Sequence, residues 1–381
     1  MKYCNKCVMP DTKPFITFDE KGLCNACKAH EAKKNFSNQI DWSQRKKEFD
    51  LLMEKARARK SKFYDVLIPV SGGKDSIYQV HIASKYKLRM LAVNVDFGIK
   101  TEIGIQNLKV VPKMGATLLT VRPEQSYHNE MIKIGFKDFG DPDLMSHALT
   151  YAYCMWVAVN FSVPVVIAGE NSAFEYGGDK ISAQKPMMDR DWFYKYIVTK
   201  GITPEYMAKT YSIPIEILKP YAFPQEELEE KDISPIFLSY YFHWDSEKHL
   251  EIAKKYGFKT LPKPREGTFR NYVGLDEKIN RIHQYMKVIK FGYGRASDHA
   301  CEEIRNNRLT REQAIKLVRK YDVVALSKDH VDDFCKLINI TKNEFWSVMD
   351  KYCNKKVCRI KKDKTLQIIG QDNFEKIHSK R

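Results

Sequence analysis

The sequence predicts an α/β protein: a doubly wound parallel sheet with an N-terminal zinc-ribbon module and a mainly α-helical C-terminal region. Three observations carry this prediction. Short apolar runs alternate with helical segments between residues 65 and 170, two cysteine pairs lie within the first 27 residues, and helical patterns dominate beyond about residue 205. Apolar strands alternating with helices are typical of a parallel sheet covered on both faces.

The first module is predicted over residues 1–40 from its cysteines. Cys4, Cys7, Cys24 and Cys27 form the pattern C-x2-C-x16-C-x2-C. Each C-x2-C turn directs two thiolates toward one point, and two turns complete a tetrahedral sulfur shell that favours Zn²⁺ over an iron–sulfur cluster. A closed shell leaves no position for a substrate, so we expect a structural zinc that folds a segment too short for its own core.

The α/β domain is predicted over residues 41–205. An amphipathic helix over residues 43–60 leads into it. Buried strands are predicted at residues 65–70, 90–96, 117–121 and 164–169, with crossover helices at 75–87, 101–114 and 144–161. In such sheets ligands bind outside the carboxyl ends of the strands, so the residues that follow each strand are the functional candidates.

Residues 206–381 are predicted to be mainly helical and to complete the substrate site. Helices are expected over residues 246–256, 276–290 and 298–308, and a capping box at Thr310–Gln313 opens a further helix. The region ends in a basic tail, in which residues 351–381 hold 10 Lys and Arg against 3 Asp and Glu.

The net charge of +16 lies mostly at the two ends of the chain, and the middle is nearly balanced. The predicted enzyme core therefore need not bind a polyanion, and charge runs of this kind are usually solvated faces. No apolar run is long enough for a membrane helix, and the N-terminus has no signal-peptide pattern. We expect a cytoplasmic protein, in which cysteines are metal ligands or buried groups rather than disulfides.

The chemistry is predicted to lie in the segment Ser71-Gly72-Gly73-Lys74-Asp75-Ser76, between the first strand and its helix. Its glycines let the backbone turn tightly and approach a phosphate. The N–H groups at the helix start bind the anion, while the two serines add hydroxyl donors and the lysine adds a cation. The spacing is not that of a Walker A loop.

This S-G-G-K-D-S segment resembles the pyrophosphate loop of the PP-loop ATP pyrophosphatases, which have a HUP-type sheet. Members cleave ATP between its α and β phosphates and use the AMP to adenylate a carbonyl oxygen, which a nitrogen or sulfur nucleophile displaces. The resemblance implies ATP and Mg²⁺ as cofactors, with Asp75 helping to hold Mg²⁺. The nucleotide-binding residues it implies are Ser71, Gly72, Gly73, Lys74, Asp75, Ser76, Asn94, Val95, Asp96 and Gly169.

Longer segments resemble the N-acetyl sugar amidotransferases of bacterial surface polysaccharide biosynthesis. They are Tyr3–Thr12, Gly22–Cys27, the stretch from Gly169 to Gly178, and Phe291–His299. These enzymes convert an acetamido group on a sugar to an acetamidino group. The resemblance implies that the acetamido oxygen is adenylated and replaced by ammonia, with release of AMP and pyrophosphate, in the synthesis of lipopolysaccharide O-antigen or flagellin glycan.

Within this resemblance the residues take different roles. Lys74 and Asp75, with Mg²⁺, would stabilise the phosphoryl step. Asp96, Glu170 and His299 are the candidate bases for deprotonating ammonium. The substrate-binding candidates are Glu170, Asn171, Arg295 and His299, of which Arg295 could bind a carboxylate or diphosphate bidentately. The weaker substrate candidates are Lys180, Arg270 and the aromatic cluster Phe242–Trp244.

The source of ammonia is predicted to be a partner. Position 2 is lysine, so the chain lacks the N-terminal cysteine of a built-in glutaminase. In the family, ammonia comes from a glutaminase and a barrel-shaped channel protein that resemble the two subunits of imidazole glycerol phosphate synthase. We expect such a partner, an acetamido sugar substrate, no membrane and no nucleic acid.

Two other functions are compatible with parts of the sequence. A PP-loop tRNA-modifying enzyme, such as a thiolase, also pairs C-x2-C turns with this loop, and the basic tail would suit RNA phosphates. The missing pair of reactive thiols argues against it, because Cys154 lies in an apolar helix and is expected to be buried. A nucleotide-binding module that has lost catalysis is disfavoured by the intact loop.

Overall fold

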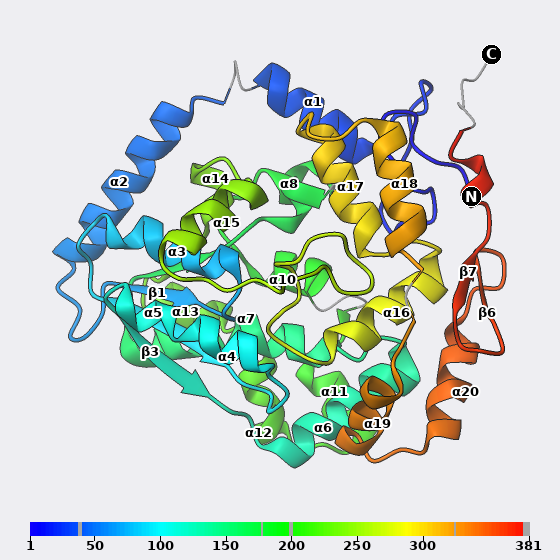
Figure 1. The fold of residues 1–381 in the computed structure, drawn as a ribbon. Helices are drawn as coiled ribbons and strands as arrows, with labels where there is room; N and C mark the ends of the chain where they lie inside the picture. Colours follow the sequence, from blue (N-terminus) through cyan, green and yellow to red (C-terminus); the bar gives the residue numbers. More distant parts are fainter. Residues whose placement is uncertain (37–39, 177, 198–200, 324, 376–381) are drawn as a thin grey trace.

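The computed structural model describes residues 1–36, 40–176, 178–197, 201–323 and 325–375 (Figure 1). Within these ranges, five parallel strands form one sheet in the order β3-β2-β1-β4-β5. The strands are β1 Val66–Pro69, β2 Met90–Val95, β3 Ala116–Val121, β4 Val165–Ala168 and β5 Ser234–Phe237. The predicted doubly wound parallel sheet is confirmed, and its first four strands lie where the sequence predicts them.

The fifth strand, β5, was not predicted. It lies in the segment assigned from the sequence to the helical region and contains Pro235. A proline lacks the N–H that a central strand needs, so a four-residue strand containing one has almost no sequence signal. Its position at the edge of the sheet, where β4 is its neighbouring strand and only an isolated bridge joins Ile236 to Met187 among the described residues, explains why the proline is tolerated.

Helices cover both faces of the sheet, as the continuous burial of β2 and β4 requires. On one face α3 (Lys74–Ser84) and α15 (Ser246–Lys255) pack over Ile68 and Ala92 in one apolar cluster. On the other face α7 (Leu144–Phe161) packs over Leu67 and other side chains of opposite parity. The parallel register places the segments after β1, β2 and β4 at one edge of the sheet, because carboxyl ends of parallel strands coincide.

The N-terminal module lies against the C-terminal region (Figure 1). The ring of Tyr3 contacts Phe374 with centroids 4.0 Å apart, and the Asn373 side chain donates to the carbonyl of Met1 at 3.0 Å. The hairpin of β6 (Cys358–Ile360) and β7 (Leu366–Ile368) packs on α16 (Asn280–Phe291). The basic segment predicted as a tail is thus folded into the body through residue 375.

The remaining elements connect these parts. They are α1 Asn25–Phe36, α2 Trp42–Ala58, α4 Glu102–Leu108, α5 Val110–Lys113, α6 Gln125–Ile134, the π-helical turn Gly135–Phe139, α8 Ser172–Tyr176, α9 Lys180–Ala183, α10 Arg190–Tyr196, α11 Pro204–Tyr211, α12 Ile215–Leu218, the 3₁₀ turn Lys219–Tyr221, α13 Gln225–Glu230, α14 Leu238–Tyr241, α17 Arg295–Arg305, α18 Arg311–Tyr321, α19 Lys328–Leu337, α20 Lys342–Tyr352 and the 3₁₀ turn Gln371–Asn373. The predicted capping box of Thr310 and Gln313 is present at α18. None of the helices in the described ranges combines the length and apolarity that crossing a membrane demands.

Candidate active site

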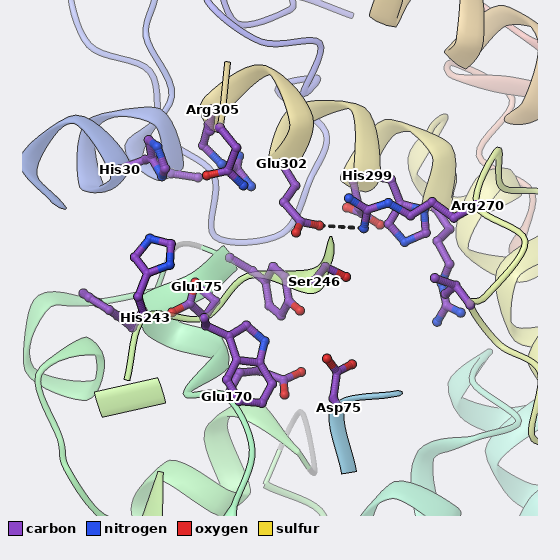
Figure 2. Close-up of a pocket in the computed structure, with 18 of the residues that line it drawn as sticks. His30, Asp75, Glu170, Glu175, His243, Ser246, Arg270, His299, Glu302 and Arg305 are labelled. Atoms are coloured by element: carbon purple, nitrogen blue, oxygen red, sulfur yellow. Dashed lines mark hydrogen bonds and ion pairs between the residues drawn. The ribbon is translucent and has the colours of Figure 1, made fainter. Parts of the chain in front are cut away.

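A cavity of about 660 Å³ lies at the carboxyl ends of the strands and is walled by all three parts of the chain. Figure 2 shows the side chains that point into it. Those used below are Lys13 and His30 from the cysteine module, Lys74, Asp75 and Glu170 from the sheet domain, and Arg270, Lys287, Arg295, His299, Glu302 and Arg305 from the helical region. The structure therefore gathers five of the predicted site residues, Lys74, Asp75, Glu170, Arg295 and His299, in one place.

The loop between β1 and α3 has the backbone that a phosphate cradle requires. Gly72 has φ +91°, and a Cβ there would lie 2.8 Å from the carbonyl oxygen of Gly104. The Ser76 hydroxyl donates to the Gly73 carbonyl at 2.8 Å, which braces the turn. Gly73 begins α3 without a side-chain cap, so the first N–H groups of the helix remain available to an anion.

Asp75 is held from two sides at the start of α3. One carboxylate oxygen accepts from Lys74 Nζ at 2.7 Å, and the other lies 2.8 Å from His249 Nδ1 on α15. Burial opposes ionisation of Asp75, but Lys74 and His249 outweigh it and hold its pKa well below the ordinary value. A carboxylate only accepts hydrogen bonds, so His249 Nδ1 must carry the proton. The Asp75 side chain is 37% exposed toward the cavity and remains accessible to a cation.

His249 was missed by the sequence analysis. It is 1% exposed, stacks on Tyr78 with centroids 3.8 Å apart, and meets Trp244 edge-on at 4.4 Å. Asp75 and His249 are 174 positions apart in the chain. A lone histidine in an amphipathic helix carries no sequence signal of such a contact; only the packing of α15 on α3 creates it.

Glu170 follows β4 and lines the same cavity. Burial, together with the nearby negative charge of Asp75, raises its pKa to about 7. A carboxyl group with this pKa exchanges protons near neutral pH, which is the property that a general base for ammonium needs.

Asn94 and its neighbours after β2 divide into different environments. The Asn94 side chain is 1% exposed, and neither its nitrogen nor its oxygen has a hydrogen-bond partner within the described ranges. A buried amide without partners costs free energy, so this group fits a ligand such as a nucleotide base. The Val95 side chain packs in the core on the face of the sheet that α7 covers. Asp96 is engaged by Arg122 and by the Gly98 N–H at 2.9 Å, and it does not line the cavity.

Asn171 is also absent from the cavity wall. Its amide nitrogen donates to the Ser182 carbonyl at 2.8 Å, and its oxygen accepts from Trp192 Nε1 at 3.1 Å. Both polar atoms of the Asn171 side chain thus form hydrogen bonds within the protein. Gly169 beside it packs under Trp244, to which an added Cβ would approach within 3.3 Å.

The Gly-Tyr-Gly-Arg-Ala-Ser segment anchors α17 at the cavity. Buried Asp322 accepts hydrogen bonds from the N–H groups of Gly294 at 2.9 Å and Ser297 at 3.1 Å. A Cβ at position 294 would come within 2.7 Å of the Asp322 carboxylate, which accounts for the glycine. This anchor leaves Arg295 and His299 directed to the cavity.

His299 is neutral in this setting. Its Nδ1 lies 2.9 Å from the hydroxyl of Thr268. Burial, with the positive charges of Arg270 and Arg295, holds the pKa of His299 well below its ordinary value. Arg270 is buried and makes an ion pair with Glu302 at 2.8 Å, shown in Figure 2. Glu302 had no sequence signal, since it lies in an ordinary charged helix.

The four module cysteines form a metal-binding geometry. All four are fully buried, and their sulfur atoms lie within 4.8 Å of one another. Sulfur–sulfur distances are 4.0 Å for Cys4–Cys27 and 3.8 Å for Cys7–Cys24. Thiolates bound at 2.3 Å to a tetrahedral zinc lie about 3.8 Å apart, so the predicted ligand set fits zinc. Such a zinc would fold the module and present Lys13 and His30 to the cavity.

Comparison with protein families identifies the helical part of the site. Residues 266–369 match the family described as LPS biosynthesis protein WbpG-like, C-terminal domain. The chain carries a WbpG-like C-terminal domain. A search of curated proteins returns no match. The WbpG-like domain supplies Arg270, Arg295, His299, Glu302 and Arg305 to the cavity, and the match confirms the predicted family resemblance over residues 266–369.

Proposed function

We propose that the chain is an ATP-dependent, AMP-forming amidotransferase that converts the acetamido group of an N-acetylated, nucleotide-activated sugar to an acetamidino group in bacterial surface glycan synthesis. The observation that carries the proposal is a single cavity in which the S-G-G-K-D-S loop faces α17 of the WbpG-like domain. The wall formed by the loop suits a nucleotide. The wall formed by α17 belongs to the WbpG-like domain, whose family is described as an LPS biosynthesis protein family.

The nucleotide wall fits ATP through the loop and its cation. The unpartnered Asn94 amide lies outside the cavity lining, near the carboxyl end of β2. The Gly72 cradle and the open N-terminus of α3 would hold the phosphates, with Lys74 neutralising charge. Asp75 is ionised and accessible, so it would hold Mg²⁺. Bound Mg²⁺ would supply charge stabilisation during phosphoryl transfer.

The proposed reaction has two steps, adenylation of the acetamido oxygen and its replacement by ammonia. The acetamido oxygen attacks the α-phosphorus of ATP and pyrophosphate leaves. Ammonia adds to the resulting imidate carbon, and AMP departs with the former amide oxygen, leaving C=NH. Glu170 is the best-placed base, because its pKa of about 7 lets it take a proton from ammonium. Neutral His299 lies in the same cavity and can orient the amide.

A tRNA-thiolating function has less support. In the part of the chain that the structure describes, no thiol lines the cavity. Cys154 is buried, and that burial raises the pKa of its thiol to about 12, so it is not a nucleophilic thiolate. Ammonia as nucleophile agrees better with these surroundings. We further propose that it is delivered by a glutaminase and a barrel-shaped channel protein, as the family resemblance implies.

The test is pyrophosphate release with ATP, Mg²⁺ and ammonium chloride, comparing activated acetamido sugars with bulk tRNA. Sugar-dependent release, with mass spectrometry showing oxygen replaced by NH, supports the proposal; release that depends on tRNA refutes it. Lys74→Ala and Asp75→Ala should each abolish turnover. Lys85→Ala, at an exposed position just after the same helix, is the matched control and should retain it.

A further inference from the structure

Residues 270–278 of the WbpG-like domain lie against the loops that follow β1 and β2. The Thr101 N–H donates to the Asp276 carbonyl at 3.0 Å. An added Cβ at Gly104 would lie 2.7 Å from the Asp276 Cα, and the Gly104 carbonyl would lie 2.8 Å from a Cβ added at Gly72. The WbpG-like domain is therefore attached to the sheet domain directly beside the S-G-G-K-D-S loop.

Tyr272 is the aromatic side chain that this segment places next to the lysine of the loop. It is 7% exposed and packs in the apolar cluster on the face of the sheet that α3 covers. Lys74 Nζ lies 5.5 Å from the centroid of the Tyr272 ring, which is within the range of a cation–π interaction. The Tyr272 hydroxyl donates to the Glu247 carboxylate in the first turn of α15, and this bond fixes the ring. Lys74 lines the cavity and Tyr272 does not, so the ring contacts the lysine from the protein side.

A second cation lies near the same ring, but it differs in its charge partners. The guanidinium carbon of Arg270 is 5.7 Å from the ring centroid, and Arg270 makes an ion pair with Glu302 at 2.8 Å. For Lys74, the carboxylate within ion-pair distance among the described residues is that of Asp75, at 2.7 Å. Arg270 is thus held by the helical region, whereas Lys74 is held by its sequence neighbour and by the ring.

The contact with the ring matters because Asp75 has another task in the proposed function. Asp75 would hold Mg²⁺, and a carboxylate bound to a metal attracts the Lys74 ammonium less. An aromatic face attracts an ammonium group without neutralising its charge, and the attraction is strongest where water is excluded. The Lys74 side chain is 8% exposed, so it meets this condition. Its charge and N–H donors stay available to a phosphate.

We propose that Tyr272 is a positioning residue that holds the Lys74 ammonium at the S-G-G-K-D-S loop through the face of its ring. The WbpG-like domain then supports the anion-binding loop as well as forming the opposite wall of the cavity. A tyrosine that only filled the apolar cluster would act through its size, whereas this role depends on the electron density of the ring. That Lys74 meets the phosphates of ATP rests on the proposed function; the contact between ring and lysine does not.

The experiment varies the electron density of the ring at nearly constant shape. Binding of α,β-methylene-ATP with Mg²⁺ to the zinc-loaded full chain is measured by calorimetry. Tyr272→Phe keeps the ring and should bind within about twofold of the wild type. Trifluorophenylalanine in place of Tyr272 should bind about fivefold more weakly, because fluorine withdraws electron density from the ring face. Tyr272→Leu removes the ring and should bind about tenfold more weakly.

The matched control is trifluorophenylalanine in place of Phe258. This side chain packs in the same apolar cluster, and no described residue places a cation over its ring. The substitution should leave the affinity unchanged. Repeating the series at position 272 in a Lys74→Met background identifies the partner of the ring. In that background the fluorinated ring and the native ring should bind the analogue equally, because the effect acts through the lysine.

Other results would overturn the role of Tyr272. Equal affinity across the series at position 272 would do so, as would equal losses with and without Lys74. A loss in Tyr272→Phe as large as that of the fluorinated chain would assign the effect to the hydroxyl group. The melting temperature of each variant shows whether it is folded. A wild type that does not bind the analogue refutes the nucleotide site and the role of Tyr272 with it. A chain that follows the expected series but shows no sugar-dependent turnover keeps the role of Tyr272 and refutes the proposed function.

Discussion

Replacing Glu170 by glutamine should change the pH dependence of stability in a direction that the structure dictates. Burial and the charge of Asp75 raise the pKa of Glu170 from 4.5 to about 7 in the folded state. The folded protein therefore binds a proton between these values that the unfolded chain has released. The stability that Glu170 contributes is full below pH 4.5 and is lost as the pH rises through 7. Glutamine mimics the protonated carboxyl and loses nothing.

The size of the effect follows from the same pKa. Each pH unit between pH 5 and the folded-state pKa lowers the wild-type free energy of unfolding by at most about 1.4 kcal/mol. The decrease between pH 5 and pH 8 therefore has an upper bound of about 3 kcal/mol. The side chain lines an open cavity and is partly hydrated, so we expect about 1.5 kcal/mol. Asp322, whose pKa burial raises to about 6, titrates in both proteins and cancels in the comparison.

The assay is urea unfolding of the wild type and Glu170→Gln at pH 5 and pH 8, followed by tryptophan fluorescence. The free energy of unfolding of the variant, relative to the wild type, should rise by about 1.5 kcal/mol between the two pH values. Glu54→Gln, at an exposed position of α2, should show no such rise. Parallel pH profiles for Glu170→Gln and the wild type would refute the placement of Glu170 beside Asp75 in a partly buried wall of the cavity.

Three other changes test the rest of the site. Gly72→Ala forces a Cβ to within 2.8 Å of the Gly104 carbonyl at a φ of +91°, so it should lose ATP binding in calorimetry and about 2 kcal/mol of stability; normal ATP affinity would contradict the cradle. His249→Leu removes the donor to Asp75 and should weaken Mg²⁺-dependent ATP binding about tenfold without altering zinc content, whereas unchanged affinity would show that Asp75 needs no such support. Cys24→Ser should release the bound zinc, as measured by metal analysis, and lower the melting temperature; full zinc content would contradict the four-sulfur site.

The sequence was most informative where local pattern and chemistry coincide. Apolar runs bounded by turns located β1 to β4, and the spacing of the cysteines predicted a sulfur cluster that the structure forms with all four side chains buried. The S-G-G-K-D-S segment predicted a strand–turn–helix loop, and the positive φ of Gly72 agrees with it. These features depend on residues close in sequence, which is why their patterns are readable.

The sequence was least informative about which polar side chains meet. Asp96 and Asn171 follow strands, as cavity residues do, yet Arg122 engages one and backbone groups near α9 engage the other. His249 and Glu302 lie in helices whose patterns indicate only exposed and buried faces. Their roles depend on how α15 and α17 pack against the loop after β1, which no local pattern specifies.

By itself, then, the sequence determined the alternation of strands and helices, the glycine-rich loop after β1 and the clustered cysteine pairs, because each is encoded by residues within one turn or one repeat of the backbone. Only the tertiary structure decided that the cysteine module walls the cavity, that His249 supports Asp75, and that Tyr272 lies beside Lys74. Those contacts join segments far apart in the chain. Burial of apolar surface sets them, both between the cysteine module and the helical region and between the sheet domain and the helical region.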